Sequence, residues 1–163
     1  MKYCIKLKVD INCEAGHHKY SGLYVSAMRN HRHVLDLLLQ QPDIDVNKGD
    51  FSKATPLYVA CEENHIEIVR RLTSRPDIDL NATTTRGSTA LIAAAQQGGA
   101  ECVKALLDCS GLNVNWKDNG GDSAIMYAAF FNRKEVFELL MRHQRTDLKT
   151  RNFDRKTLVQ IAL

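Results

Sequence analysis

The hexapeptide PDIDVN at residues 42–47 is followed by PDIDLN at residues 76–81, a step of 34 positions. The same step connects five segments that each place a small or capping residue beside apolar ones: SGLYVSA from Ser21, TPLYVAC from Thr55, TALIAAA from Thr89, SAIMYAA from Ser123 and TLVQIAL from Thr157. A further series with this spacing is Asn30, Asn64, Gly98 and Asn132. Matches at several phases of one period indicate a duplicated structural unit, which predicts a stacked array.

Each unit has the pattern of two helices joined by a tight turn. A Ser or Thr is positioned to cap the first helix, and in the second unit Pro56 follows as a first-turn proline. Small residues within this helix let neighbouring helices approach closely. The Asn or Gly position tolerates a left-handed backbone, so we expect the first helix to end there. Apolar residues on one helical face, as within 34–39, predict a longer second helix.

A short acidic and apolar link such as PDIDVN at 42–47 follows each second helix. A polar stretch follows each link, for example KGDFSKA at 48–54 and WKDNGGD at 116–122, and its Gly, Asp and Asn residues favour a hairpin turn. One unit alone cannot bury its apolar face, whereas stacked units can. The sequence therefore predicts an all-α solenoid of helix-turn-helix units with short hairpin loops and a 34-residue period. We expect one domain over 1–163, with full units at 16–49, 50–83, 84–117 and 118–151 and partial units at 1–15 and 152–163.

This pattern resembles the ankyrin repeat. Residues 55–69, TPLYVACEENHIEIV, are similar to the family's Thr-Pro-Leu-His … Gly-His-x-Glu-Ile-Val core, and DVN at 45–47 is similar to its Asp-Val-Asn link. The resemblance covers essentially the whole chain. It departs in two respects, because Tyr, Ile, Met or Gln replaces the family's His and because 33 residues is the commoner unit length. The resemblance implies a protein-binding scaffold that is not an enzyme.

Composition is that of an ordinary folded domain, with 44% apolar and 25% charged residues and a net charge of +3. This charge is too small to indicate nucleic-acid binding by itself, and no apolar run is long enough to span a membrane. The five cysteines form no CxxC pair, which argues against a disulfide framework and favours a reducing compartment, cytoplasmic or nuclear. Cys4, Cys61 and Cys102 occupy apolar positions of the repeat, where we expect small core side chains.

The sequence contains no recognisable catalytic chemistry. It has no Gly-rich phosphate loop and no His-Glu-x-x-His motif. We therefore expect no catalytic residue, no cofactor and no metal site.

In the ankyrin family, ligands usually meet the hairpin tips and the concave face of the first helices. Carried onto this sequence, that implies a surface of Tyr20, Arg29, Phe51, Glu62, Glu63, Arg86, Gln96, Gln97, Asp122, Phe130, Phe131 and Phe153. The counterparts of Phe130 and Phe131 are Met-Arg, Glu-Glu and Gln-Gln, so this position does not require apolar residues. Two adjacent aromatic residues there predict a binding anchor, with local packing as the alternative. Phe153 is a candidate to extend the anchor, and Trp116 either extends it or packs along the hairpin stem.

The resemblance also implies a modification. Ankyrin repeats are substrates of an iron- and 2-oxoglutarate-dependent asparaginyl hydroxylase that prefers a Leu eight residues before Asp/Glu-Val/Ile-Asn. Asn47 fits this context through Leu39, and Asn115 fits it in part through Leu107, although Asn113 replaces the acidic residue. The alternative for both is a purely structural asparagine.

Three hypotheses about partners follow. The first is a protein or peptide partner for a monomer without membrane association. The second is a regulatory segment of a larger enzyme or channel, suggested by the incomplete terminal units, which indicate a fragment of a longer array or frayed ends. The third is an acidic ligand or nucleic acid, with steep salt dependence, bound by the basic stretch Arg142, Arg145, Lys149, Arg151, Arg155 and Lys156.

Overall fold

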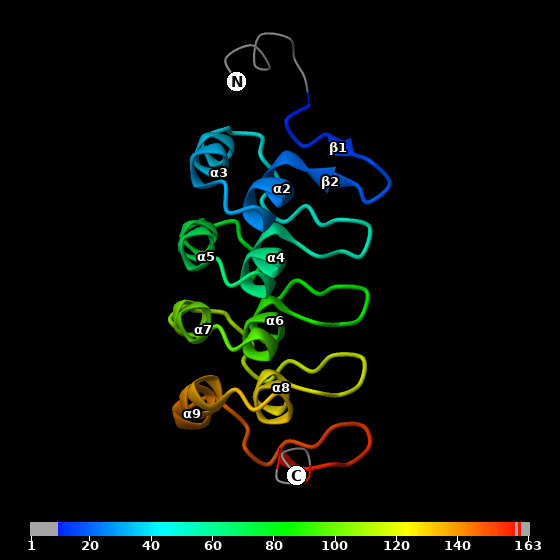
Figure 1. Ribbon diagram of the computed structural model, residues 1–163, viewed down its shortest axis with the longest axis vertical. Coiled ribbons are helices and arrows are strands. Elements are labelled where there is room, and N and C mark those ends of the chain that lie inside the picture. The colour runs from blue at the N-terminus through cyan, green and yellow to red at the C-terminus, as the bar shows by residue number, and fades with distance from the viewer. Residues whose placement is uncertain (1–9, 159, 161–163) are drawn as a thin grey trace.

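The computed structural model describes residues 10–158 and 160, which form a stack of helix pairs (Figure 1). The pairs are α2 (Gly22–Met28) with α3 (Arg32–Leu39), α4 (Pro56–Glu62) with α5 (Ile66–Thr73), α6 (Ala90–Gln97) with α7 (Ala100–Leu107), and α8 (Ala124–Phe130) with α9 (Lys134–Arg142). The first helices form one column, the second helices form another, and the hairpin loops project on the opposite side of the first-helix column (Figure 1). The predicted all-α solenoid is confirmed.

The strands are minor elements of this fold. β1 (Glu14–Ala15) pairs antiparallel with β2 (Tyr20–Ser21) in the first hairpin. Most of the predicted partial unit at 1–15, including Cys4, lies outside the described residues, as do 159 and 161–163 of the one at 152–163. No helix among the described residues combines the length and apolar character needed to cross a bilayer.

Each first helix begins at a Ser or Thr with an extended backbone. The Ser21 hydroxyl oxygen accepts a hydrogen bond from the Tyr24 N–H at 3.1 Å, and Thr55 and Thr89 make the equivalent bond. These are N-cap bonds that satisfy an otherwise free amide of the first turn. Ser123 has the same backbone conformation, but its buried Oγ makes no hydrogen bond with the described residues.

The turn between the two helices uses a left-handed residue in every unit. The φ angles are 55° at Asn30, 56° at Asn64, 83° at Gly98 and 53° at Asn132. The following N–H then returns to the end of the first helix, as from His31 to the Ser26 carbonyl at 2.8 Å. This geometry satisfies the last helical carbonyls, so the helix ends expected from the sequence are confirmed.

The second helices are amphipathic, but they are only slightly longer than the first, with eight or nine residues against seven or eight. In α5, Ile68, Val69 and Leu72 are buried while Arg70 and Arg71 face solvent. The expected longer second helix is found in three units, whereas α6 and α7 both have eight residues.

Successive first helices pack on one another along the column, and small side chains lie at their contacts. Ala60, Ala94 and Ala128 are fully buried, and their size permits close approach of the backbones. The buried apolar residues form one cluster that runs through the stack, so each unit covers its neighbour's apolar face. Cys61 and Cys102 belong to this core as expected.

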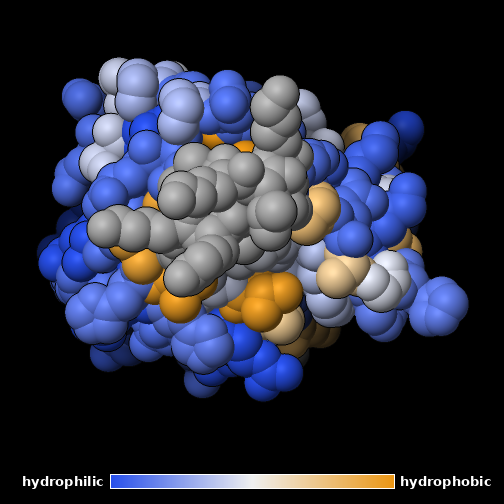
Figure 2. Space-filling model, turned by 90° about the horizontal axis from the view of Figure 1, so that it is seen from above, coloured by the Kyte–Doolittle hydropathy of each residue, from blue (hydrophilic) through white to orange (hydrophobic). Residues whose placement is uncertain are grey.

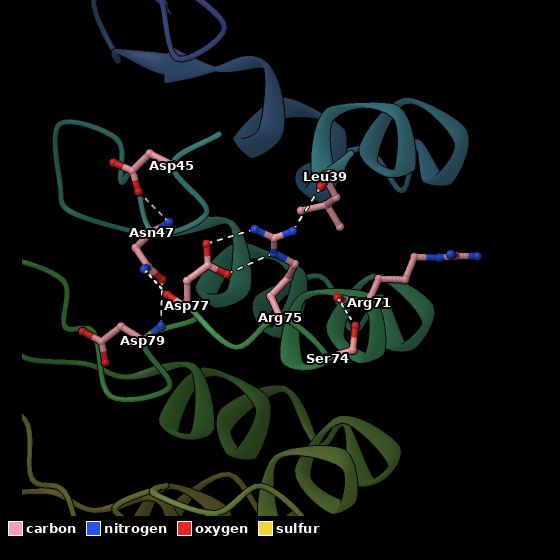
Figure 3. Close-up of polar contacts among 8 residues, drawn as sticks. All are labelled: Leu39, Asp45, Asn47, Arg71, Ser74, Arg75, Asp77 and Asp79. Carbon is pink, nitrogen blue, oxygen red and sulfur yellow. Dashed lines mark hydrogen bonds and ion pairs between the residues drawn. The ribbon is translucent and has the colours of Figure 1, made fainter. Parts of the chain in front are cut away.

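One asparagine in each link connects a unit to the next. The Asn47 side-chain amide donates to the Asp77 carbonyl at 2.8 Å, and its oxygen accepts from the Asp79 N–H at 2.8 Å (Figure 3). The same two bonds are made by Asn12, Asn81 and Asn115. We call these four residues the asparagine ladder. Its paired bonds hold adjacent links at a fixed offset.

Arg75 adds a second connection beside the ladder. Its guanidinium donates to both carboxylate oxygens of Asp77 at 3.0 Å, and to the carbonyl of Leu39 in the preceding unit at 3.2 Å (Figure 3). The hydrogen bond from Arg75 holds the pKa of the Asp77 carboxyl below its usual value. The contact ties the end of α5 to the end of α3.

The hairpins are also joined to one another. A backbone N–H of each donates to a carbonyl of the preceding hairpin: Phe51 to His18, Thr85 to Ser52, Asn119 to Arg86 and Phe153 to Gly120, at 2.8–3.2 Å. Gly121 has a φ of 80°, and a Cβ there would lie 2.6 Å from the Phe153 nitrogen. A side chain at this position would therefore push the last hairpin away.

A matched pair of serine substitutions tests the capping. We expect Ser21→Ala to lower the free energy of unfolding by about 1 kcal/mol because a cap bond is lost. Ser123→Ala should change it little or raise it, because a buried hydroxyl without a partner is removed. Urea unfolding followed by circular dichroism measures both, and equal losses would contradict the assignment.

The ladder is tested by Asn81→Ala, which removes two bonds between units. We expect a loss of about 2 kcal/mol in the free energy of unfolding, at roughly 1 kcal/mol per hydrogen bond. Asn119→Ala is the control, since Asn119 donates only one exposed side-chain bond, to Thr85 at 3.1 Å. A loss at Asn81 no larger than that at Asn119 would show that the ladder contributes little.

Candidate protein-docking surface

The predicted contact residues lie on two neighbouring elements, the C-terminal ends of the first helices and the hairpins beside them (Figure 1). Helix ends or caps carry Arg29, Glu62, Glu63, Gln96, Gln97, Phe130 and Phe131. The hairpins and the strand or residues leading from them carry Tyr20, Phe51, Arg86, Asp122 and Phe153. We call this region the helix–hairpin surface.

The structure brings three of these residues, Asp122, Phe130 and Phe131, to one groove of about 500 Å³. We call it the α8 groove. Its other lining residues are Met126, Tyr127, Asn152, Asp154, Lys156 and Gln160. Residues of α8 and its C-cap form an apolar wall. Asp122, just before α8, and residues of the following hairpin form a polar wall. Such a combination suits a ligand with both apolar and charged groups.

The apolar wall is built from three aromatic rings. Tyr127 and Phe131, one helical turn apart, lie nearly parallel with centroids 6.1 Å apart, and Phe130 meets Phe131 edge to face at 5.0 Å. Phe130 is 66% exposed and Phe131 is 38% exposed. The Tyr127 hydroxyl donates to the Asp118 carboxylate at 2.7 Å, which fixes its ring. Burial and this bond raise the pKa of Tyr127, so the phenol stays neutral.

The polar wall carries two carboxylates, Asp122 and Asp154, and one ammonium group, Lys156. The Asp122 carboxylate accepts a hydrogen bond from the Asn152 amide at 3.0 Å. Burial raises the pKa of Asp122, and the nearby charges of Asp118 and Asp154 raise it further, against the opposing effects of Asn152 and Lys156. Among the described residues, no ion pair involves Asp118, Asp122 or Asp154. The groove therefore carries negative charge that a ligand could neutralise.

The equivalent positions of the preceding units carry different chemistry. Glu62 and Glu63 end α4, and Gln96 and Gln97 end α6. Burial raises the pKa of the Glu62 carboxyl, with the charges of Glu63 and Asp50 adding to the effect. Along the helix–hairpin surface, the helix ends thus change from acidic through neutral to aromatic.

Tyr20 and Phe51 belong to a separate aromatic cluster at the first hairpins. Tyr20 stacks on Tyr24 with centroids 4.8 Å apart and on His18 at 5.2 Å, while Phe51 is tilted against His18 at 5.3 Å. Tyr20 is half-buried, so much of its ring serves to pack the hairpin on α2. Phe51 is 59% exposed and remains available for contact.

Phe153 and Trp116 lie outside the lining of the α8 groove. Phe153 is 71% exposed at its hairpin tip, and its ring lies over Gly121, where a Cβ would be 2.7 Å from the ring. The Trp116 indole N–H donates to the Gly87 carbonyl at 3.0 Å. Of the two expectations for Trp116, packing along the hairpin stem is the one observed.

Six lining residues are not part of the predicted surface given above: Met126, Tyr127, Asn152, Asp154, Lys156 and Gln160. A signal existed for Tyr127, because residues four apart on a helix share a face and Phe131 was already a candidate. Asn152 and Lys156 come from the next hairpin, so only the stacking of units places them here.

Burial disfavours the reactive thiolate form of Cys61, Cys102 and Cys109. Burial raises the pKa of Cys102 to about 11 and also raises that of Cys61. Cys109 is half-buried, its thiol donates to the Ala105 carbonyl at 3.3 Å, and burial raises its pKa as well. A high pKa keeps a thiol protonated and unreactive at neutral pH.

The basic C-terminal stretch is partly engaged within the protein. The Arg145 guanidinium donates to the carbonyls of Leu112 and Leu107 at 3.2 and 3.4 Å, and Arg151 donates to the Arg155 carbonyl at 3.1 Å. Arg142 pairs with Glu138 at 3.9 Å. Binding of an acidic ligand by this stretch stays a prediction.

Asn47 and Asn115, the candidates for hydroxylation, are both members of the asparagine ladder. Asn81 makes the same two bonds but has Thr73 at the position where the hydroxylase prefers Leu. We expect that co-expression with the hydroxylase adds the mass of one oxygen atom at Asn47 and not at Asn81, as read by peptide mass spectrometry. Unmodified Asn47 under these conditions would refute the prediction.

A family model described as ankyrin repeats (3 copies) matches residues 1–84 and again residues 76–152. None of the curated proteins compared with this chain matches it.

Proposed function

This chain belongs to the ankyrin-repeat family, whose members generally mediate protein–protein interaction, and we propose that it binds a protein or peptide partner through the concave face and the hairpin tips. The α8 groove is the principal contact in this proposal. Family members are typically non-enzymatic, and the proposal includes no catalytic step. A regulatory segment of a larger protein would use the same surface.

The observation that carries the proposal is the exposure of Phe130 and Phe131. Their counterparts, Glu62–Glu63 and Gln96–Gln97, show that the fold accepts polar side chains at this position. Packing of the unit therefore does not require two aromatic rings here. Exposed aromatic residues that meet in a groove are typical of interface anchors, because large rings supply much of the binding energy.

A reducing compartment, cytoplasmic or nuclear, is part of the proposal. Its support is that Cys13, Cys61, Cys102 and Cys109 are free thiols. Secreted domains of this size more often pair their cysteines.

The proposal is tested by affinity capture from a lysate of the source cells, with bound proteins identified by mass spectrometry. We expect one or more proteins to be retained by the wild-type chain and reduced at least about tenfold on Phe130→Ala with Phe131→Ala, since each anchor contributes roughly 1–2 kcal/mol.

Met141→Ala with Leu148→Ala is the matched control, because both residues are exposed apolar side chains outside the groove. This variant should retain the same proteins as the wild type. Circular dichroism spectra of both variants should match that of the wild type. If the two variants retain the same proteins in equal amounts, the α8 groove is not the contact.

A further inference from the structure

We infer that the α8 groove binds a partner segment in which a large apolar side chain stands next to an arginine. This inference rests on the proposed function and specifies its ligand. The apolar side chain packs on the rings of Phe130 and Phe131. The guanidinium lies at the opposite wall, near the carboxylates of Asp122 and Asp154.

The volume of the groove limits the size of the partner's apolar side chain. A volume of about 500 Å³ accommodates a few side chains and not a helix or a folded domain. Phe130 and Phe131 meet edge to face, which leaves the exposed face of Phe130 free for packing. Covering this face removes apolar surface from water, and that favours a Leu, Met or aromatic anchor.

The charges of the groove favour a basic residue next to the partner's apolar side chain. Among the described residues that line the groove, two carboxylates, Asp122 and Asp154, accompany one cation, Lys156, and Asp118 accepts the hydrogen bond of the lining Tyr127 hydroxyl. None of the three carboxylates is in an ion pair with another described residue. A cationic partner residue would neutralise this charge, whereas an acidic one would be repelled. This also disfavours the phosphates of a nucleic acid at the groove.

Arginine fits this site better than lysine. A planar guanidinium bonds a carboxylate through two N–H groups at once and is more weakly hydrated than an ammonium group. The ammonium group of lysine is a strongly hydrated point charge that loses more on entering an apolar groove. A preference for Arg over Lys is therefore a specific consequence of the two-walled arrangement.

The helix–hairpin surface extends the prediction beyond the groove. Glu62 and Glu63 end α4, two units before α8, with only neutral Gln96 and Gln97 on the helix end between them. Packed helices lie about 10 Å apart, so this acidic pair is roughly 20 Å from the groove. An extended segment rises about 3.3 Å per residue and would place a second basic residue about six positions from the anchor.

The test is selection of peptides from a random phage-displayed library on the immobilised full chain, with parallel selection on Phe130→Ala with Phe131→Ala. We expect clones enriched only on the wild type to pair Leu, Met, Phe or Trp with an adjacent Arg. Enriched clones that lack a basic residue, or that favour Asp and Glu, would overturn the inference. So would the absence of any clone that depends on the two phenylalanines.

Charge variants then test the carboxylates with one synthetic peptide from the selection, by fluorescence anisotropy. Asp122→Asn with Asp154→Asn should weaken binding at least about tenfold, as loss of charge-assisted hydrogen bonds would. Asn at position 122 keeps the oxygen that accepts from Asn152, and thermal unfolding verifies that the hairpin is intact. Replacing the peptide's Arg by Lys should also weaken binding.

Asp108→Asn is the matched control, because Asp108 is an exposed carboxylate at the end of α7 and does not line the groove. It should leave peptide affinity unchanged. Equal affinity of the peptide for the Asp122/Asp154 variant and the wild type would overturn the inference. Failure of the proposed function is recognised separately, because it would appear as protein partners captured equally by the wild type and the Phe130/Phe131 variant.

Discussion

Every feature of this surface depends on a fixed register between neighbouring units. Burial of apolar faces drives the units together, but it is non-directional and would tolerate sliding. The asparagine ladder removes that freedom, because each amide must meet both a carbonyl and an N–H of the next link, at 2.7 to 2.8 Å. Backbone bonds between the hairpins fix the other side of the stack.

This register separates positions that build the stack from positions that are free to vary. Ala60, Ala94 and Ala128 are confined to small size because another helix lies against them. The helix ends one turn later have no such neighbour, so the same backbone position can carry Glu, Gln or Phe. The units thus share one scaffold, but the residues at their first-helix ends differ, and those at the end of α8 are aromatic.

The two ends of the stack differ from its sides. Figure 2, which views the stack from above, shows a mostly hydrophilic rim and apolar side chains gathered next to the grey residues whose placement is not described. Val34 of α3 and Leu148 in the last link are partly exposed. Their counterparts Ile68 and Val114 are buried because another unit lies against them. Exposure of core positions is therefore a property of stack ends, whereas exposure of Phe130 is a property of the helix–hairpin surface.

Local features were predictable because their causes lie within a few residues. The left-handed backbone at Asn64 and the cap at Thr55 each depend on the residue itself and its immediate neighbours. Ser123 shows the limit of such reasoning, since the expected residue type is present and the cap bond is not. The roles of Trp116 and Phe153 likewise depend on which neighbouring hairpin each side chain meets.

The sequence by itself determined the period, the helix pairs, the membership of the core and the two phenylalanines that the scaffold does not need. The period, the helix pairs and the core follow from residues that recur every 34 positions, and the two phenylalanines stand out as a departure from that repeat. Only the tertiary structure decided that Asn152 and Asp154 share one groove with them, because the groove is lined by residues of two consecutive units. Residues about 30 positions apart meet there through the stacking of units, which no single unit's sequence specifies.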